Sequence, residues 1–502
     1  MRYIAGTRRG EAPLRYFLVA AVGAGIALRF VNLGGQSLWV DEVITLKNSH
    51  IGEGGIVSSF FRTLQGPLVS LLMHFWGSLS TDEAFMRIPF AVAGALSVGA
   101  VYLLAKSVHD SWTALHAAFV AALSPILIWY SQEIRGYSFL VLFSIMMTYS
   151  FIQWLARPTA RNGLYYGVFV FAGLVSNLSA GFVAVGHLVY LVLTAGRRRL
   201  IGRWIVVVFV VLLVFSPWVR EMIERSLRHP APAASTERVM GGGGLSVAAI
   251  PYTYFTYAVG YTLGPSLREL QADRAPAVSG NIGWIVLGLA GLGIPVAVGI
   301  TRLARANATF LVLLLIWLVV PVLAFSAVAA LEVKAFTPRY GLAAVPPLIL
   351  LAGHGLSGIS RTRFWPLLGL FAAVVGISTY NYMAVPAYGK DDARQAASVI
   401  KAGFRDGDAV LAVYTAEALE HYLTGFVPVG VFGANDLASE EAMRSRCRQV
   451  AEPSDRVWLS LCREQMVDNK GIIKGWFDRN MDLVSSTAVP GVKVFLYRKR
   501  GG

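Results

Sequence analysis

Two adjacent carboxylates, Asp41 and Glu42, lie in the stretch GGQSLWVDEVITL, between a tryptophan and a run of aliphatic residues. Apolar neighbours raise the pKa of a carboxyl group by desolvation, and such a group can take a proton from a hydroxyl as a general base. The same pair also suits the first turn of a helix, where a carboxylate caps the N-terminus or interacts with the helix dipole. For an isolated pair the helix N-terminus is the more common explanation.

Basic and aromatic side chains border apolar runs at three other places. The segments EAFMRIPF, IWYSQEIRGYSF and EVKAFTPRYGLAAVPP contribute Arg87, then Glu133 and Arg135, then Lys334, Arg339 and Tyr340. Singly, each basic residue is explained as an anchor whose charged end reaches the membrane surface. Together they suit a phosphate, because the planar guanidinium of Arg forms paired hydrogen bonds with phosphate oxygens.

Long apolar runs separate these residues and must be the elements that position them. The chain has 502 residues, of which 55% are hydrophobic and only 15% charged. Eleven runs approach the roughly 20 residues that cross a bilayer. They lie near residues 14–31, 87–105, 113–130, 137–155, 164–177, 180–195, 203–217, 283–301, 309–330, 341–356 and 364–384. The sequence therefore predicts a polytopic α-helical membrane protein with about eleven transmembrane helices.

The basic residues of the short loops fall on alternate connections, all on one side. They are Arg2, Arg8, Arg9, Lys106, Arg157, Arg161, Arg197, Arg198, Arg199, Arg203, Arg302, Arg305, Arg361 and Arg363. Because such residues favour the cytoplasmic side, the N-terminus is expected in the cytoplasm and the C-terminus outside, across the inner (plasma) membrane. Much of the net charge of +15 is thus a topology signal, and no contiguous basic face indicates nucleic-acid binding.

Two domains are expected. Residues 1–385 would form the membrane domain, with outer loops at 32–86 and 218–281, and residues 386–502 a soluble domain outside. The loop 218–281 is rich in Gly and Pro and carries the aromatic stretch YTYFTY, which predicts an irregular interfacial loop. A lid that covers the substrate is the alternative.

The segment after residue 385 has the pattern of a small α/β domain. Helical stretches such as DDARQAASVIKAGF alternate with extended ones such as AVLAVY and RVWLSL, and a hairpin is expected around Pro490-Gly491. No glycine-rich phosphate loop occurs there. Its cysteines, Cys447 and Cys462, would form a disulfide on an oxidising side or remain as two buried thiols.

Four stretches together resemble the C-type (GT-C) glycosyltransferases. They are GGQSLWVDE, FMRIPFAVAGALSVGAVYLLA, LSPILIWYSQEIRGYSF and FTPRYGLAAVPPLILLAG. The branch that looks most similar is shared by the protein O-mannosyltransferases and the bacterial lipid A aminoarabinose transferases. The resemblance covers most of residues 15–385, and a C-terminal α/β domain fits the bacterial members.

The resemblance implies the GT-C fold and a sugar donor linked to a polyprenyl phosphate, used outside the cytoplasm. It implies that Asp41 is the catalytic base, with Glu42 beside it. Arg87 would match the family's Arg before the second span, and Tyr340 the aromatic residue near the donor phosphate. Arg135, Lys334 and Arg339 fit the same cluster.

The expected reaction is transfer of a sugar to a hydroxyl of a glycolipid, lipopolysaccharide, polysaccharide or protein. A base takes the hydroxyl proton, and the cations stabilise the phosphate that leaves. One base with direct displacement predicts inversion at the anomeric carbon. Retention would need a second, nucleophilic carboxylate, for which Glu42 and Glu133 are candidates.

No cofactor is required by this scheme, although Asp41 and Glu42 would suit a divalent metal ion near the phosphate. The main alternative function is a carrier or flippase for polyprenyl-linked or other amphiphilic substrates. Transporters generally place ionisable groups near mid-membrane and show repeated halves. Here the charges gather at the outer rim, and the sequence shows no clear repeat.

Overall fold

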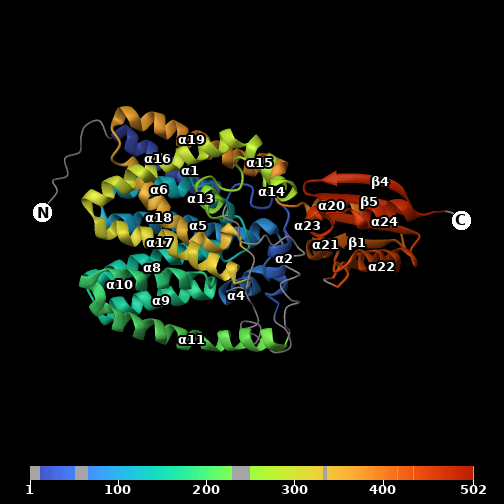
Figure 1. The fold of residues 1–502 in the computed structure, drawn as a ribbon, viewed down its shortest axis with the longest axis horizontal. Helices are drawn as coiled ribbons and strands as arrows, with labels where there is room; N and C mark the ends of the chain where they lie inside the picture. The colour runs from blue at the N-terminus through green and yellow to red at the C-terminus, as the bar shows by residue number, and fades with distance from the viewer. Residues whose placement is uncertain are drawn as a thin grey trace.

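A computed structural model describes residues 12–50, 66–228, 249–331, 336–414, 416–433 and 435–500. A bundle of long helices forms the body of the molecule, and a small sheet with its helices lies at one end (Figure 1). The bundle helices are α1 Ala12–Leu28, α5 Glu83–Val108, α6 Ser111–Leu123, α7 Pro125–Ser131, α8 Tyr137–Ala156, α9 Ala160–Ser176, α10 Ala180–Leu193, α11 Ile201–Arg228, α16 Ile282–Ala306, α17 Ala308–Ala330, α18 Val345–Leu356 and α19 Arg361–Ala384.

Each predicted apolar run corresponds to a helix of this bundle. Within the described residues, six helices are long and apolar enough to cross a membrane, and a seventh crossing is formed if α6 and α7 count as one span. Several others, including α1 and α10, are apolar but shorter. The multi-span membrane architecture is therefore confirmed, whereas the number of eleven crossings stays a prediction.

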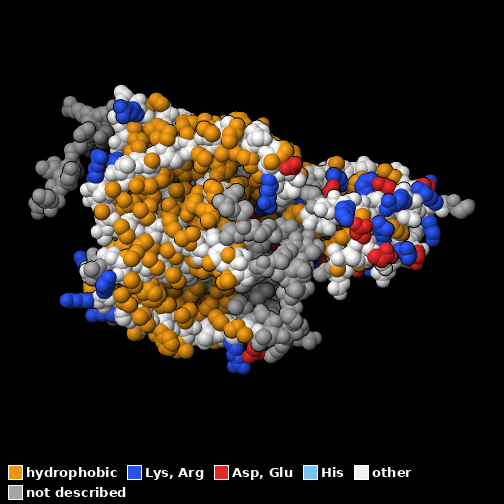
Figure 2. Space-filling view, in the orientation of Figure 1, with side chains coloured by type: hydrophobic (Ala, Val, Ile, Leu, Met, Phe, Trp, Pro, Cys, Tyr) orange, Lys and Arg blue, Asp and Glu red, His pale blue; other side chains and the backbone are white. Residues whose placement is uncertain are grey.

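The surface of the bundle explains how it resides in a membrane. Hydrophobic side chains cover its flank, and Lys and Arg side chains gather at the end far from the sheet (Figure 2). The sheet region carries mixed charges instead. This distribution is that of a lipid-facing band between two polar ends.

A break between α6 and α7 shows how the sequence shapes the bundle. Pro125 has no backbone N–H to continue α6, and the two helices meet at 59°. Arg29, whose side chain is fully buried, donates to the carbonyls of Ala121 and Ala122 at 2.9 and 2.7 Å, and to that of Gly25 at 2.6 Å. The guanidinium thus satisfies carbonyls at the C-terminal ends of α1 and α6.

The segments at the sheet end of the bundle are largely helical. They are α2 Val40–Lys47, α4 Pro67–Gly77, α13 Ala249–Val259, α14 Leu267–Ala272, α15 Arg274–Gly280 and the short turns η2 Pro338–Ala344 and η3 Pro386–Tyr388, while η1 Ala195–Leu200 lies at the other end. The prediction of an irregular loop is wrong for 249–280, because the aromatic stretch forms α13 and buries Phe255 and Tyr257. Residues 229–248, which hold the Gly-rich part, lie outside the described residues.

The C-terminal region contains a five-stranded sheet in the order β2-β1-β3-β5-β4. Its strands are β1 Ala409–Val413, β2 Val429–Val431, β3 Arg456–Cys462, β4 Met481–Val489 and β5 Val492–Lys499. Its helices are α20 Ala393–Gly403, α21 Ala416–Leu423, α22 Glu440–Ala451, α23 Glu464–Val467 and α24 Ile472–Asn480. Strands β1, β2 and β3 are parallel, and β4 and β5 form the predicted hairpin. The predicted α/β domain after the helical bundle is confirmed.

The positions of the two cysteines distinguish between a disulfide and two buried thiols. Cys447 packs in the core on one side of the sheet, and Cys462 in the core on the other side. Both are free and buried. The thiol interpretation is therefore the one that the structure supports.

Candidate functional site

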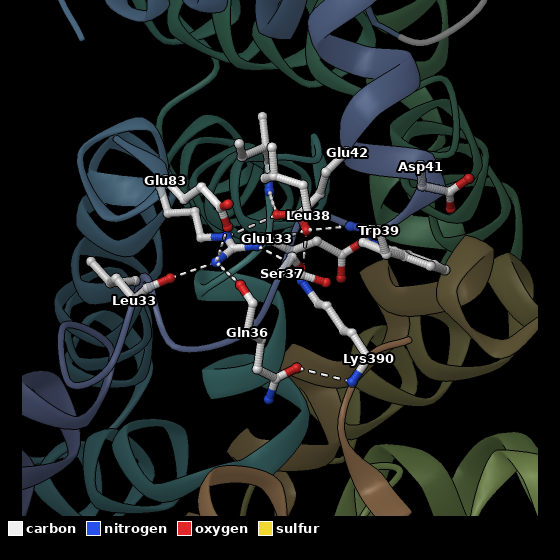
Figure 3. Close-up of polar contacts among 12 residues, drawn as sticks. Leu33, Gln36, Ser37, Leu38, Trp39, Asp41, Glu42, Glu83, Glu133 and Lys390 are labelled. Carbon is white, nitrogen blue, oxygen red and sulfur yellow. Dashed lines mark hydrogen bonds and ion pairs between the residues drawn. The ribbon is translucent and has the colours of Figure 1, made fainter. Parts of the chain in front are cut away.

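The two carboxylates that follow Trp39 lie in the first turn of α2, as the helix N-terminus interpretation predicts. Successive residues of a helix point about 100° apart, so neighbouring side chains face different surroundings. Glu42 points into a cluster of polar groups, and Asp41 points away from it (Figure 3). Glu42 is fully buried, while the Asp41 side chain is 18% exposed. The two side chains therefore lie in separate environments.

Glu42 is held by two cations from distant parts of the chain. Its carboxylate accepts two hydrogen bonds of 2.9 Å from Arg87, one of 3.0 Å from Lys390 Nζ and one of 3.0 Å from the backbone N–H of Ile134. Burial alone would raise the Glu42 pKa, but the charges of Arg87 and Lys390 hold it well below its usual range. An ionised carboxylate with this many partners is a poor proton acceptor, so Glu42 is suited to hold structure rather than to act as a base.

Arg87 is fully engaged by its neighbours. A guanidinium has five N–H donors, and Arg87 makes five hydrogen bonds: two to Glu42 and one each to the carbonyls of Leu33, Gln36 and Ser37. The side chain is 1% exposed. This differs from the expectation that Arg87 contacts the donor phosphate, because no donor remains to meet one. Arg87 instead fixes the loop that leads into α2.

Asp41 faces a second group of cations. Its Oδ2 is hydrogen-bonded to Arg339 Nη1 and lies 3.9 Å from Arg135 Nη2. Arg135 also donates to the Asp41 carbonyl at 3.2 Å and to Thr45 Oγ1 at 3.1 Å. Where the sequence suggested apolar neighbours, the structure thus places two guanidinium groups beside the Asp41 carboxylate.

Aromatic rings hold Arg339 in position. Its guanidinium lies 5.6 Å from the ring centre of Trp39 and 5.4 Å from that of Tyr340, within the range of cation–π attraction. The turn η2, which carries Arg339, is attached to α13 by a 2.9 Å hydrogen bond from Tyr257 to the Pro338 carbonyl. Asp41, Arg135, Arg339 and Tyr340 are therefore brought together at the sheet end of the bundle.

Another buried carboxyl, Glu133, lies in the connection between α7 and α8. Its Oε2 accepts a 3.2 Å hydrogen bond from Trp129, and its Oε1 has no hydrogen-bond partner among the described residues. Burial raises the Glu133 pKa. Glu133 therefore holds its proton more tightly than Glu42, which is labelled in the same polar cluster (Figure 3).

Two lysines bear on the site, one expected from the sequence and one not. Lys334 lies outside the described residues, so its predicted role stays a prediction. Lys390 is not identified from the sequence, because a single Lys in YGKDD, before a soluble domain, resembles a surface residue.

Among the described residues, no three His, Cys, Asp or Glu side chains gather as a metal site requires.

Comparisons with known proteins agree with this architecture. Residues 65–220 match the family of dolichyl-phosphate-mannose-protein mannosyltransferases. No curated protein sequence matches the chain. The structure of ArnT from Cupriavidus metallidurans in the apo state is 14% identical, covers 96% of this chain and 97% of its own, and superimposes with a TM-score of 0.56.

Two further structures carry lipids related to the expected donor. ArnT from the same organism bound to undecaprenyl phosphate is 12% identical, with 96% of this chain and 98% of that one covered and a TM-score of 0.55. The archaeal oligosaccharyltransferase AglB from Archaeoglobus fulgidus, in complex with an inhibitory peptide and a dolichol-phosphate, is 12% identical; 96% of this chain and 74% of that one are covered, with a TM-score of 0.54. The resemblance predicted from the sequence is thus confirmed, and the chain has the fold of the GT-C glycosyltransferases.

Proposed function

We propose that this protein transfers a sugar from a polyprenyl-phosphate-linked donor to a hydroxyl of an acceptor on the outer face of the plasma membrane. The observation that carries the proposal is the contact of the Asp41 carboxylate with the guanidinium groups of Arg339 and Arg135, because a carboxylate can act as a base and guanidinium groups bind phosphate well. The lipid-bound relatives support a lipid phosphate as the donor group. The basic residues of the short loops lie on alternate connections, all on one side, which supports an outer location of the site and a cytoplasmic N-terminus.

The proposed reaction is a single displacement. Asp41 accepts the proton of the acceptor hydroxyl as its oxygen attacks the anomeric carbon. The bond from that carbon to the phosphate oxygen breaks, and its electron pair leaves with the polyprenyl phosphate. Attack opposite the leaving group inverts the anomeric carbon, and no step uses a metal ion.

Arg339 has two successive roles in this scheme. In the donor-free state it pairs with Asp41, which weakens the carboxylate as a base. A donor phosphate carries negative charge and competes for the same guanidinium. When Arg339 turns to the phosphate, Asp41 becomes a stronger base at the moment when the donor is present, and Arg135 and Tyr340 complete the phosphate site. Lys334 is the remaining predicted phosphate ligand.

Glu42 and Arg87, both expected at the reaction centre, are assigned a supporting role. Their ion pair with Lys390 fixes the first turn of α2, and this turn sets the direction of Asp41. They are positioning residues, because they act on the reaction through Asp41.

The test is mass spectrometry of envelope glycolipids and glycoproteins from cells that lack the gene. The cells are complemented with the intact protein, with Asp41→Asn, or with Asp82→Asn as a matched control. Asp82 is also a carboxylate at a helix N-terminus, where it caps α5. We expect one sugar-sized mass increment to vanish and to be restored by the intact protein and the control alone. Restoration by Asp41→Asn would reject Asp41 as the base and favour a carrier.

A further inference from the structure

The C-terminal sheet has a feature that doubly wound proteins use to bind ligands. The chain runs from β1 through α21 to β2 on one side, and then through α22 to β3 on the other side of β1. The order of strands therefore reverses between β1 and β3. In open parallel sheets, ligands bind outside the carboxyl ends of the strands at such a switch point.

The residues at these two strand ends have an unusual backbone. Tyr414 follows β1 with φ 72°, and Arg463 follows β3 with φ 47°. Among the described residues only one other non-glycine residue, Asn32, has a positive φ. Left-handed conformations cost energy in residues other than glycine and concentrate at functional sites. The two side chains also meet, since the Arg463 guanidinium lies 5.6 Å from the ring centre of Tyr414.

This edge of the sheet is turned toward the helical bundle. Helix α23, which continues from Arg463, contacts α14, and α21, which starts near Tyr414, contacts α2. Figure 1 shows α23 between the sheet and α14. The carboxylates of Asp391 and Asp41 are both close enough to Tyr414 to add to the rise in its pKa that burial causes. The switch point and the proposed base therefore face the same region.

Lys390 and Asp391 link the two places. Lys390 contacts Glu42, next to Asp41, and the Asp391 carboxylate accepts hydrogen bonds from Arg463 Nε at 2.9 Å and from Arg268 at 3.2 Å. The Asp391 carbonyl accepts one more from Ser37 at 3.0 Å. One dipeptide thus fixes the position of the strand ends relative to Asp41.

Charge and free donors indicate what this edge would bind. Arg268 and Arg463 share the single carboxylate of Asp391, so the group has an excess positive charge. Only Nε of Arg463 is used in this pairing. Its two terminal nitrogens form no hydrogen bond with the described residues, and the same holds for the Tyr414 hydroxyl. Guanidinium N–H groups and a phenol are donors suited to phosphate or carboxylate oxygens.

We propose that the carboxyl ends of β1 and β3 form an acceptor subsite, in which Arg463 and Tyr414 bind an anionic group of the acceptor while its hydroxyl meets Asp41. This rests on the proposed function and names the class of acceptor: a glycan or glycolipid that carries a phosphate or carboxylate close to the hydroxyl that receives the sugar. The C-terminal domain would then select the acceptor, and the bundle would hold the donor.

The test is binding of small probes to the purified full-length protein, measured by ligand-observed NMR. The probes are methyl glucoside, methyl glucoside 6-phosphate and methyl glucuronide, which share one ring and differ in charge. We expect the protein to bind a charged probe about tenfold more tightly than the neutral one, the effect of one charge-assisted hydrogen bond. Which charged probe binds better identifies the anion.

Variants separate this subsite from the donor site. Arg463→Gln should bind all three probes alike, whereas Arg339→Gln and the exposed control Arg444→Gln should keep the preference. If Arg463→Gln does not fold, Tyr414→Phe takes its place, with a smaller loss of preference expected. The proposal is overturned if Arg463→Gln still binds the charged probe more tightly than the neutral one, or if Arg339→Gln loses this preference instead. It is also overturned if the intact protein binds the charged and neutral probes equally. Asp41→Asn should keep the preference, so failure of the proposed reaction and failure of this subsite give different results.

Discussion

Lys390 Nζ donates a 3.0 Å hydrogen bond to Glu42 Oε2 across 348 residues of chain, and both side chains are buried. The contact connects the first helix after α1 with the segment that enters the C-terminal domain. Burial lowers the Lys390 pKa, and the charge of Glu42 opposes that shift. The pair therefore links two segments that are far apart in the chain, beside the first turn of α2 that carries Asp41.

Removing Lys390 should weaken this link. We expect Lys390→Met to lower the free energy of unfolding by about 2 kcal/mol, because Glu42 loses one charge-assisted hydrogen bond and keeps Arg87. The control is Lys47→Met, which breaks the exposed pair with Glu420 and should cost less than about 1 kcal/mol. Thermal unfolding in detergent measures both. Equal losses in the free energy of unfolding would show that the buried pair stabilises the protein no more than the exposed pair does.

Adjacent carboxylates should give opposite phenotypes. Glu42→Gln leaves Arg87 and Lys390 buried without a carboxylate, so we expect a loss of about 3 to 5 kcal/mol in stability. Asp41→Asn should keep the unfolding temperature near that of the intact protein while transfer falls by about 10² to 10⁴, the usual contribution of a general base. Stability and turnover of the two variants, measured side by side, decide the point. A stable Glu42→Gln protein without activity would reverse the assignment.

Arg339 should matter to the step in which the phosphate leaves. Arg339→Gln removes the pairing with Asp41 and the donor to the phosphate, and we expect the transfer rate to fall by about 10² to 10³. Arg220→Gln is the control, since that side chain is 81% exposed and pairs with Glu224 on α11. If the two variants retain similar rates with the lipid donor, Arg339 is a structural partner of Asp41 alone.

Glu133 should make stability depend on pH. Its folded-state pKa is raised above the ordinary value of 4.5, so the folded protein binds this proton more tightly than the unfolded chain. The contribution of the Glu133 proton to the free energy of unfolding is fully present below about pH 4.5, and it is lost as the pH rises through the folded-state pKa. Relative to Glu133→Gln, which does not titrate, the intact protein should lose melting temperature over that range. Melting curves from pH 4 to 8 check this, and parallel curves would contradict it.

The sequence predicts what local patterns determine. Apolar runs locate the bundle helices, and Pro490-Gly491 locates the hairpin. The separation of Asp41 from Glu42 is also a local consequence of helix geometry. It was missed because both neighbours were expected to share one task.

Contacts between distant segments could not be predicted from the sequence. Arg87 was assigned to phosphate because its type and place fit; that its five donors meet Glu42 and three loop carbonyls depends on how the loop folds back. The same holds for Lys390, whose partner lies 348 residues away. The left-handed backbone at Tyr414 and Arg463 has no glycine to indicate it.

The distance between Glu42 and Lys390 along the chain has a consequence for biogenesis. A ribosome adds about 5 to 20 residues per second, so roughly 20 to 70 seconds separate the synthesis of the two residues. During that interval Glu42 lacks the hydrogen bond from Lys390. The contacts beneath Asp41 are therefore completed only after the last bundle helix, α19, has been synthesised, so a chain truncated before residue 390 lacks one of the cations that hold Glu42.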